Sequence, residues 1–269
     1  FSNAGESVAV ALRGLRANLL RSALTVLGIV IGVGAVITMV AIAAGANLQI
    51  GDQIRSLGTN LLLIQPGGVA SGGVRLGTGT AMSLSETDAA AIAAELPGVQ
   101  VAAPGVAGTA QLVYGNRNWA TTVGGVTTEY LIARDWRVAA GRAFTADEVA
   151  AADKVVLLGA TTVARLFEAR NPIGQLVRIG NVPFTVIGVL ARKGQSSAAG
   201  RDQDDVALLP LSTAKLRLFG RYAQLDRLAV DYVLVKLNDA RSLDAATAQI
   251  GALLRQRHRI AADAESDFV

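Results

Sequence analysis

An uninterrupted apolar run, Leu24 to Ala44, constrains this chain more than any other feature. It contains no ionisable side chain and no proline. As a helix rising about 1.5 Å per residue it would measure about 32 Å, close to the roughly 30 Å hydrocarbon core of a bilayer. Its Leu, Ile and Val side chains, at about −0.4 kcal/mol each, favour insertion by roughly 4 kcal/mol. The run therefore predicts a transmembrane helix, with bounds at 23–46.

Two other interpretations of this run fit less well. A buried core helix is usually shorter and carries polar edges. A secretory signal peptide would be cleaved near Ala41-Ile42-Ala43, but the apolar part of a signal peptide spans only about 7 to 15 residues. We therefore keep the membrane helix.

The charges on either side of the run predict its orientation. Arg13, Arg16 and Arg21 precede it, whereas Asp52 and Arg55 follow it without an excess of positive charge. The positive-inside rule then places the N-terminus in the cytoplasm and the large remainder of the chain outside.

Two glycines within the run, Gly28 and Gly32, form a small-xxx-small pair. Such a pair lets a second membrane helix approach closely. We therefore expect Gly28 and Gly32 to pack against other membrane helices.

The residues before the run, 5–22, have the pattern of a basic amphipathic helix on the cytoplasmic side. Leu12 and Leu15 share its apolar face, and Arg16 lies off that face. Two interpretations stay open. The helix is either a docking surface that includes these three residues and faces a cytoplasmic partner, or a positive anchor that only sets the topology.

The residues after the run, 47–60, continue the helical periodicity. Ile50, Ile54 and Leu57 fall in line along one face, with polar residues around them. This pattern predicts a helical stalk whose seam is formed by those three residues.

Composition excludes several classes of function. A net charge of +4 with scattered basic residues and only 4% aromatic residues gives no support to nucleic-acid binding. There is no cysteine, which removes disulfides and thiolate metal sites. The single histidine, His258, lies among arginines near the end of the sequence, where we expect it to be solvated.

Beyond residue 60, strand and helix patterns form two groups with a β-rich stretch between them. Capping boxes at Ser85/Asp88 and Thr145/Glu148 mark two helix starts. In the first group, 61–135, we expect a helix over 86–96 and strands over 61–65, 99–106, 110–114 and 118–126. The middle stretch and the last group are expected to contain strands over 155–158, 175–179, 184–190, 205–210 and 228–237, and helices over 161–167, 212–219 and 242–259.

The fold class that follows is α+β. One N-terminal membrane helix with its stalk leads into an outer domain of two βαβ-type halves, 61–135 and 192–269. The β-rich stretch, 136–191, is inserted between them. A Gly180-Asn181 pair predicts a hairpin turn within this insertion.

The densest acidic cluster, Asp202, Asp204 and Asp205, does not match a known site. It lacks the turn glycine and the distant glutamate of an EF-hand loop. Neighbouring residues of a strand also point to opposite faces, which argues against an acid/base pair. We expect an exposed loop that leads into a strand, and we take it as a candidate hinge or adaptor contact consisting of Gly194, Gln195, Asp202, Gln203, Asp204 and Asp205.

No catalytic apparatus is visible in the sequence. The glycine-rich stretch 67–80 lacks the Gly-Lys-Ser/Thr ending of a phosphate-binding loop. There is no GxSxG or HExxH motif. We therefore expect the chain not to be an enzyme, with no catalytic, metal or cofactor-binding residue of its own.

Several stretches taken together resemble a known family. The resemblance is collinear over essentially the whole chain and is carried by 11–34 (ALRGLRANLLRSALTVLGIVIGVG), 57–60 (LGTN), 63–67 (LIQPG), 141–145 (GRAFT), 171–174 (NPIG), 182–190 (VPFTVIGVL), 203–205 (QDD) and 210–214 (PLSTA). On these motifs the chain resembles the permeases of the MacB type, the FtsX-like family of ABC transporters.

The resemblance implies a layout and a function. It implies a homodimer in the cytoplasmic (inner) membrane, with a periplasmic domain made of a porter unit in two halves and an inserted sabre unit. It implies that a cytoplasmic ATPase, which binds the ATP, drives export of a drug, peptide or similar substrate by mechanotransmission. A membrane-fusion adaptor and an outer-membrane duct are further implied partners.

Two alternatives stay open. Some FtsX-like proteins transport nothing and use the same motion to regulate an envelope hydrolase. A chain with this single span would instead be a bitopic binding receptor. The sequence contains no Walker motif and ends before any further membrane helix, so we expect it to be part of a longer permease.

Overall fold

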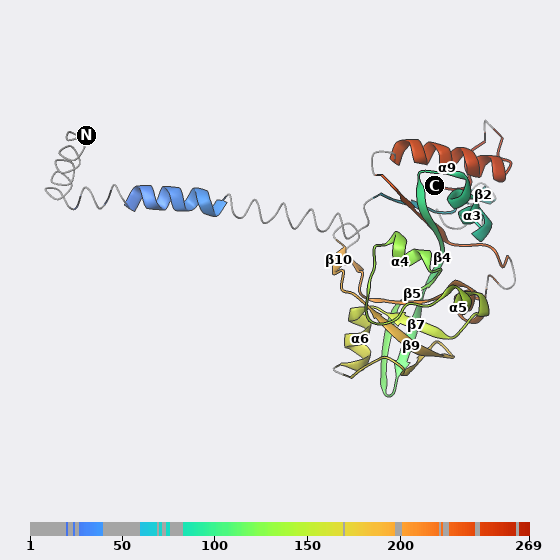
Figure 1. The fold of residues 1–269 in the computed structure, drawn as a ribbon, viewed down its shortest axis with the longest axis horizontal. Coiled ribbons are helices and arrows are strands. Elements are labelled where there is room, and N and C mark those ends of the chain that lie inside the picture. Colours follow the sequence, from blue (N-terminus) through green and yellow to red (C-terminus); the bar gives the residue numbers. More distant parts are fainter. Residues whose placement is uncertain are drawn as a thin grey trace. The chain divides into compact units, whose positions relative to one another are not determined.

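The computed structural model describes most of the chain beyond residue 82 and parts of what precedes it. The described residues are 20, 24, 27–39, 60–68, 70–71, 74–75, 83–168, 170–196, 201–220, 222, 226–239, 243–261 and 264–269. The chain divides into two compact units, Phe1–Gln53 and Ile54–Val269, which are described separately (Figure 1).

The described part of the first unit is helical. Residues 27–39 form a continuous helix whose apolar side chains are exposed. A Cβ added at Gly28 or Gly32 would meet no atom within 4 Å. The expected amphipathic helix with Leu12, Leu15 and Arg16, and the stalk seam of Ile50, Ile54 and Leu57, lie outside the described residues.

No helix within the described residues is long and apolar enough to cross a membrane. Of the expected span, 23–46, only residues 24 and 27–39 are described. The membrane span therefore stays a prediction.

The second unit begins with a small sheet covered by two helices. Its strands lie in the order β1 (Leu61–Ile64), β13 (Tyr232–Leu237) and the first part of β4 (Val99–Tyr114), all antiparallel. Helices α3 (Glu86–Glu95) and α9 (Leu243–Arg257) supply Ile92, Ile250 and Leu254 to the core that they share with this sheet.

The sheet then closes on itself. From β4 the hydrogen bonding runs through β5 (Arg117–Val126), β12 (Val206–Pro210), β7 (Val155–Leu158), β9 (Val182–Leu190) and β8 (Leu176–Ile179), and β8 pairs again with β4. Strand β6 (Val138–Gly141) adds to β9 outside the ring. Every strand of the ring contributes to one apolar cluster, which therefore fills its interior; Val106, Val123, Leu158, Ile179, Phe184 and Leu209 are members.

Side-chain alternation gives the ring an inner and an outer core. In β12, Ala207 and Leu209 face the interior cluster, whereas Leu208 joins Trp136 and Phe144 outside. All five residues of β12 are buried, as expected for a strand that is covered on both faces. Helix α6 (Ala160–Phe167) packs against β4, β5, β9 and β12, so it closes one end of the ring.

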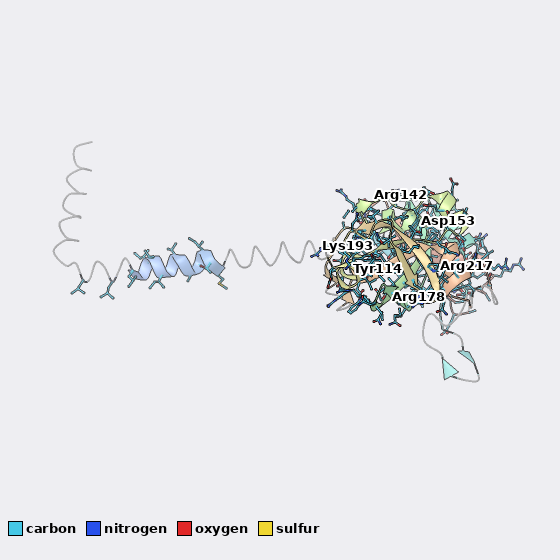
Figure 2. The ribbon with its side chains drawn as sticks, turned by 90° about the horizontal axis from the view of Figure 1, so that it is seen from below. Tyr114, Arg142, Asp153, Arg178, Lys193 and Arg217 are labelled. Carbon is cyan, nitrogen blue, oxygen red and sulfur yellow. The ribbon has the colours of Figure 1, made fainter. Side chains whose placement is uncertain are left out.

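The remaining described elements are short. They are α4 (Glu129–Ala133), α5 (Ala146–Ala151), α7 (Leu211–Thr213), the π-helix η1 (Ala214–Leu218), and the two-residue strands β2 (Ala70–Ser71), β3 (Val74–Arg75), β10 (Gln195–Ser196) and β11 (Arg201–Asp202). Exposed charged side chains such as Arg142 and Asp153 cover the outside of this unit (Figure 2).

The sequence motifs that involve hydrogen bonds between nearby residues are confirmed. Both capping boxes are present, at Ser85/Asp88 and at Thr145/Glu148. Gly180 has a positive φ in the turn that joins β8 to β9. The α+β class is confirmed.

Two predictions on elements were wrong. Strands expected over 99–106 and 110–114 form the single strand β4, because Gly108 stays extended and pairs with Val123. The helix expected over 212–219 is a short α7 followed by a π-helix. Residues 61–135, 136–191 and 192–269 contribute to one sheet, and the boundaries between them stay predictions.

Phe184→Ala tests the ring interior. Phe184 is fully buried there, so its truncation is expected to lower the free energy of unfolding by about 3–5 kcal/mol. Leu176→Ala on the neighbouring strand is the control, because Leu176 is 64% exposed; its effect should stay within about 1 kcal/mol. Urea denaturation followed by circular dichroism measures both, and equal losses would contradict the ring core.

Candidate functional site

The candidate hinge residues Gly194, Gln195 and 202–205, together called the acidic loop, are hydrogen-bonded to the ring through Asp205. One carboxylate oxygen of Asp205 accepts hydrogen bonds from Trp119 Nε1 at 2.8 Å, Thr121 Oγ1 at 2.7 Å and Thr162 Oγ1 at 3.1 Å. Trp119 and Thr121 lie on β5 and Thr162 lies on α6. Asp205 therefore joins the end of the loop to the ring and to the helix that closes it.

Asp204 faces the other side of the loop. Its carboxylate accepts hydrogen bonds from the backbone N–H groups of Lys193 at 2.7 Å and Gly194 at 3.0 Å, and it is buried. Asp202 accepts a hydrogen bond from Asp204 N at 2.9 Å. These bonds hold the beginning and the end of the loop side by side.

The expectation of an exposed loop was wrong for its acidic residues: Asp204 is buried and Asp202 and Asp205 are half-buried, because their carboxylates accept hydrogen bonds from the rest of the domain. Gly194, Asp202 and Asp204 meet, Gln195 pairs with Asp202 through the β10–β11 ladder, and Gln203 accepts from Arg134 at 2.6 Å. Asp205 points away, toward β5. Among the residues that the structure describes, no group of three or more His, Cys, Asp or Glu is placed to hold a metal ion. A role as hinge or adaptor contact stays a prediction.

Lys193 lies at the base of the same loop. Its ammonium group donates to the carbonyl oxygen of Arg134 and lies 5.7 Å from the centre of the Trp136 ring. Burial, and after it the charge of Arg134, lowers the pKa of Lys193 to about 8. The neighbouring carboxylates of Asp135 and Asp204 offset only part of this effect.

A second feature joins residues 65–67 to residues 267–269. Gln65 and Val269 exchange both backbone N–H···O hydrogen bonds at 2.9 Å, and Gly67 N donates to the carbonyl oxygen of Asp267 at 2.6 Å. Residues 65–67 directly follow β1, so this pairing places the last residues of the chain beside the start of the domain. We call it the terminal pairing.

A charged cluster supports the terminal pairing. Arg257 Nε lies 2.8 Å from Asp88 Oδ1, and His258 Nε2 lies 3.3 Å from Asp88 Oδ2. On its other side His258 Nδ1 lies 2.8 and 3.0 Å from the two carboxylate oxygens of Asp267. We call these four residues the His258 cluster.

The expectation that His258 is solvated was wrong. Its side chain is only 11% exposed, because the end of α9 brings it between α3 and the last residues of the chain. Burial lowers the pKa of His258, but hydrogen bonds with Asp267 and Asp88 outweigh this and hold it above its ordinary value. Burial likewise raises the pKa of Asp88, but hydrogen bonds from Ser85, Arg257 and His258 leave it below its usual range.

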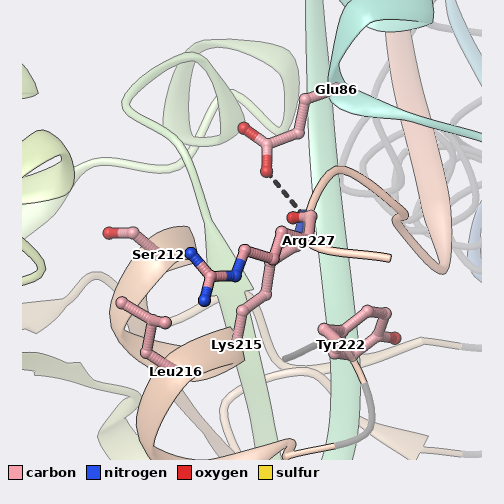
Figure 3. A pocket seen from close by; sticks show the side chains of 6 residues that line it. All are labelled: Glu86, Ser212, Lys215, Leu216, Tyr222 and Arg227. Carbon is pink, nitrogen blue, oxygen red and sulfur yellow. Dashed lines mark hydrogen bonds and ion pairs between the residues drawn. The ribbon is translucent and has the colours of Figure 1, made fainter. Parts of the chain in front are cut away.

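A third feature is a small cavity (Figure 3). It lies where the core inside the ring meets the core of the small sheet, α3 and α9. Its volume is about 210 Å³, and its lining includes Glu86, Lys215, Leu216, Tyr222 and Arg227. The ammonium group of Lys215 lies 2.5 Å from Glu86 Oε1 and 3.0 Å from the carbonyl oxygen of Arg227. Lys215 comes from η1 on the ring side, and Glu86 comes from α3 on the other side, so the pair connects the cores.

Sequence reasoning missed the His258 cluster and the Lys215–Glu86 pair. The partners lie 170 and 129 residues apart in the sequence. No motif or spacing links them. The one available signal was Asp88, which a capping box already accounted for.

Asp205→Ala tests the loop anchor. The change leaves Trp119 Nε1 and Thr121 Oγ1 without this acceptor, while Thr162 Oγ1 still reaches the carbonyl oxygen of Val206, so we expect a loss of about 2–4 kcal/mol in the free energy of unfolding. Asp153→Ala is the control, because Asp153 is exposed; its effect should stay below about 0.5 kcal/mol. Denaturant titration gives both values, and a loss as small as that of the control would contradict the anchor.

Glu86→Gln tests the pair that connects the cores. The Lys215 side chain is 5% exposed and would lose its counter-charge, but Glu86 itself is 37% exposed. We therefore expect a loss of about 1–3 kcal/mol rather than the roughly 3–5 of a fully buried pair. Glu168→Gln is the matched control, since it breaks the exposed Arg117–Glu168 pair and should cost under about 1 kcal/mol. Similar losses in thermal or denaturant unfolding would refute the difference.

Comparisons with known proteins agree with this architecture. Residues 22–253 match the family model of the MacB-like periplasmic core domain. The macrolide export ATP-binding/permease protein MacB of Chlorobaculum tepidum is 38% identical over 97% of this chain, and that of Azoarcus sp. (strain BH72) is 41% identical over 97%. The chain spans 39% and 38% of these relatives, about two fifths of their length.

Solved structures show the same fold. The periplasmic region of MacB from Actinobacillus actinomycetemcomitans superposes with a TM-score of 0.64 at 25% identity, over 80% of this chain and 90% of that one. The extracellular domain of the ABC-type transporter YknZ from Gram-positive bacteria gives 0.60 at 18% identity, over 78% and 98%, which concerns the fold alone. The resemblance to MacB-type permeases is confirmed, and the chain belongs to the family of the MacB-like periplasmic core domain.

Proposed function

We propose that this chain is the first membrane helix and the periplasmic domain of a MacB-type permease. In this proposal it lies in the cytoplasmic membrane with its N-terminus inside. A cytoplasmic ATPase subunit or domain drives it, a second copy completes the transport unit, and an adaptor and outer-membrane duct extend the route. The family membership and the apolar run of Leu24 to Ala44 support this placement.

The terminal pairing carries the mechanical part of the proposal. Residues 65–67 and 267–269 are hydrogen-bonded to each other. Ile64, which directly precedes the first segment, and Phe268 of the second both pack in the core that α3 and α9 share. A displacement applied to the start of the domain therefore reaches these helices through paired backbone rather than through a single covalent link. This arrangement suits transmission of motion, as mechanotransmission requires.

The chemistry of the described residues also suits a domain that moves rather than one that reacts. The carboxylates of the polar clusters described above accept hydrogen bonds or form ion pairs within the domain. We therefore place ATP hydrolysis in the partner ATPase. The names of the relatives suggest a macrolide as the first substrate to test, and drugs or peptides are the wider substrate class that we propose.

Enlarging the helix-packing glycines tests the membrane part of the proposal. Gly28→Leu with Gly32→Leu should reduce ATP-driven macrolide export from proteoliposomes at least tenfold, because the added side chains would separate packed helices. Gly34→Leu is the matched control, since residue 34 lies about 240° around the helix from residue 28. Its effect should be small.

The readouts separate the alternatives. The melting temperature of the outer domain should not change in either variant, which shows that any loss arises in the membrane. Unchanged export in the double variant would refute the packing role. ATP hydrolysis without transport of any tested drug or peptide would favour the non-transporting, signalling class of FtsX-like proteins.

A further inference from the structure

The His258 cluster brings together charges from three separate segments. Asp88 lies in the first turn of α3, Arg257 ends α9 and His258 directly follows it, and Asp267 belongs to the last residues of the given sequence. The backbone of Asp267 is also engaged: Gly67 N and Ser83 Oγ both donate to its carbonyl oxygen, each at 2.6 Å. The cluster therefore lies directly against the terminal pairing.

The placement of the imidazole between two carboxylates favours its doubly protonated form. Both ring nitrogens of His258 face carboxylate oxygens, Nδ1 toward Asp267 and Nε2 toward Asp88. A neutral imidazole carries one N–H and one lone pair, whereas the imidazolium donates from both nitrogens. In the neutral form either tautomer turns a lone pair toward one carboxylate, so one of the two contacts is lost.

The charge count leads to the same result. With His258 neutral, Asp88 and Asp267 carry two negative charges against the single positive charge of Arg257, which contacts Asp88. Protonation of His258 makes the cluster neutral. Of the other charged groups on these segments, Arg255 donates to Ser266 Oγ and to the carbonyl oxygens of Ala261 and Ala264, and Glu265 lies in the same terminal stretch.

We propose that His258 is a proton-operated latch that holds residues 264–269, and with them the terminal pairing, against α3 and α9. In the protonated state it bridges Asp88 and Asp267. On deprotonation one bridge opens and the terminal pairing loosens. The latch depends on the proposed function in one respect only, which is the location of the domain. In the periplasm the pH around the domain follows that of the medium.

The direction of the pH response follows from the shift already described. Because the two carboxylates raise the pKa of His258 in the folded state above its ordinary value near 6.5, the latch contributes fully below about pH 6.5. Its contribution disappears as the pH rises through the folded-state pKa. The terminal pairing is therefore tight in mildly acidic medium and looser in alkaline medium.

The titration is directly measurable because His258 is the only histidine in the chain. In the full chain in lipid nanodiscs, the imidazole NMR signals should titrate with a pKa above 6.5. Asp267→Asn should lower that pKa toward the ordinary value. Asp153→Asn, which removes an exposed carboxylate elsewhere, should leave it unchanged. A wild-type pKa at or below 6.5 would overturn the proposal.

Hydrogen exchange tests the mechanical consequence. The measured quantity is the protection factor, which corrects for the intrinsic pH dependence of exchange. Between pH 5.5 and 8.5 it should fall at the amides of Gln65, Gly67 and Val269, by up to about tenfold per unit by which the pKa of His258 is shifted. The amides paired between β13 and β4 should not change. Equal protection of the terminal pairing at both pH values would overturn the latch.

Two variants distinguish a latch from a static contact. His258→Gln should remove the pH step in protection. If that variant does not fold, Asp267→Asn retains the histidine and should weaken the step as well. A pH step that persists in the variants would refute the role of His258. If the unmodified protein shows the pH step in protection but no export, only the proposed function is refuted. If it exports substrate but shows no pH step, only the latch is refuted.

Discussion

The backbone of β4 is the constraint on which the outer domain depends. Over 16 residues, about 50 Å, its N–H and C=O groups need partners. Residues 99–105 find them on β13, residues 105–114 on β5, and residues 112–113 on β8 as well. The small covered sheet and the closed ring are therefore two parts of one hydrogen-bonded structure. Gly105 lies where the two parts meet, and a Cβ there would lie 2.3 Å from an atom of the Tyr232 ring.

A second connection restricts how these two parts move. Besides β4, the residues that lead into α3 pair with the residues that precede β13: Val230 N donates to the carbonyl oxygen of Leu84, and Glu86 N donates to that of Leu228, both at 2.9 Å. The Lys215–Glu86 ion pair lies beside this connection. Two attachments at separate points resist hinge bending more strongly than one strand would.

Sequence reasoning was accurate where the interactions are local. The capping boxes at Ser85 and Thr145 and the turn at Gly180 depend on residues within three positions of each other, and a pattern contains all the partners. Closure of the ring depends on the pairing of Leu112 with Ile179, which alternation within either strand does not encode. The same holds for His258, whose environment is set by Asp88 and Asp267 and not by the arginines next to it in sequence. The family resemblance supplied the functional hypothesis, because the individual residues carry no chemistry that would indicate one.

The positions of the two tryptophans have a consequence for spectroscopy. Trp119 donates from Nε1 to Asp205, and Trp136 donates from Nε1 to the carbonyl oxygen of Ala191 at 2.7 Å. These acceptors lie at opposite ends of the acidic loop, and the chain contains no other tryptophan. The indole emission of the native protein is therefore an intrinsic reporter on both ends of this loop, so that a change at either end can be followed without any label.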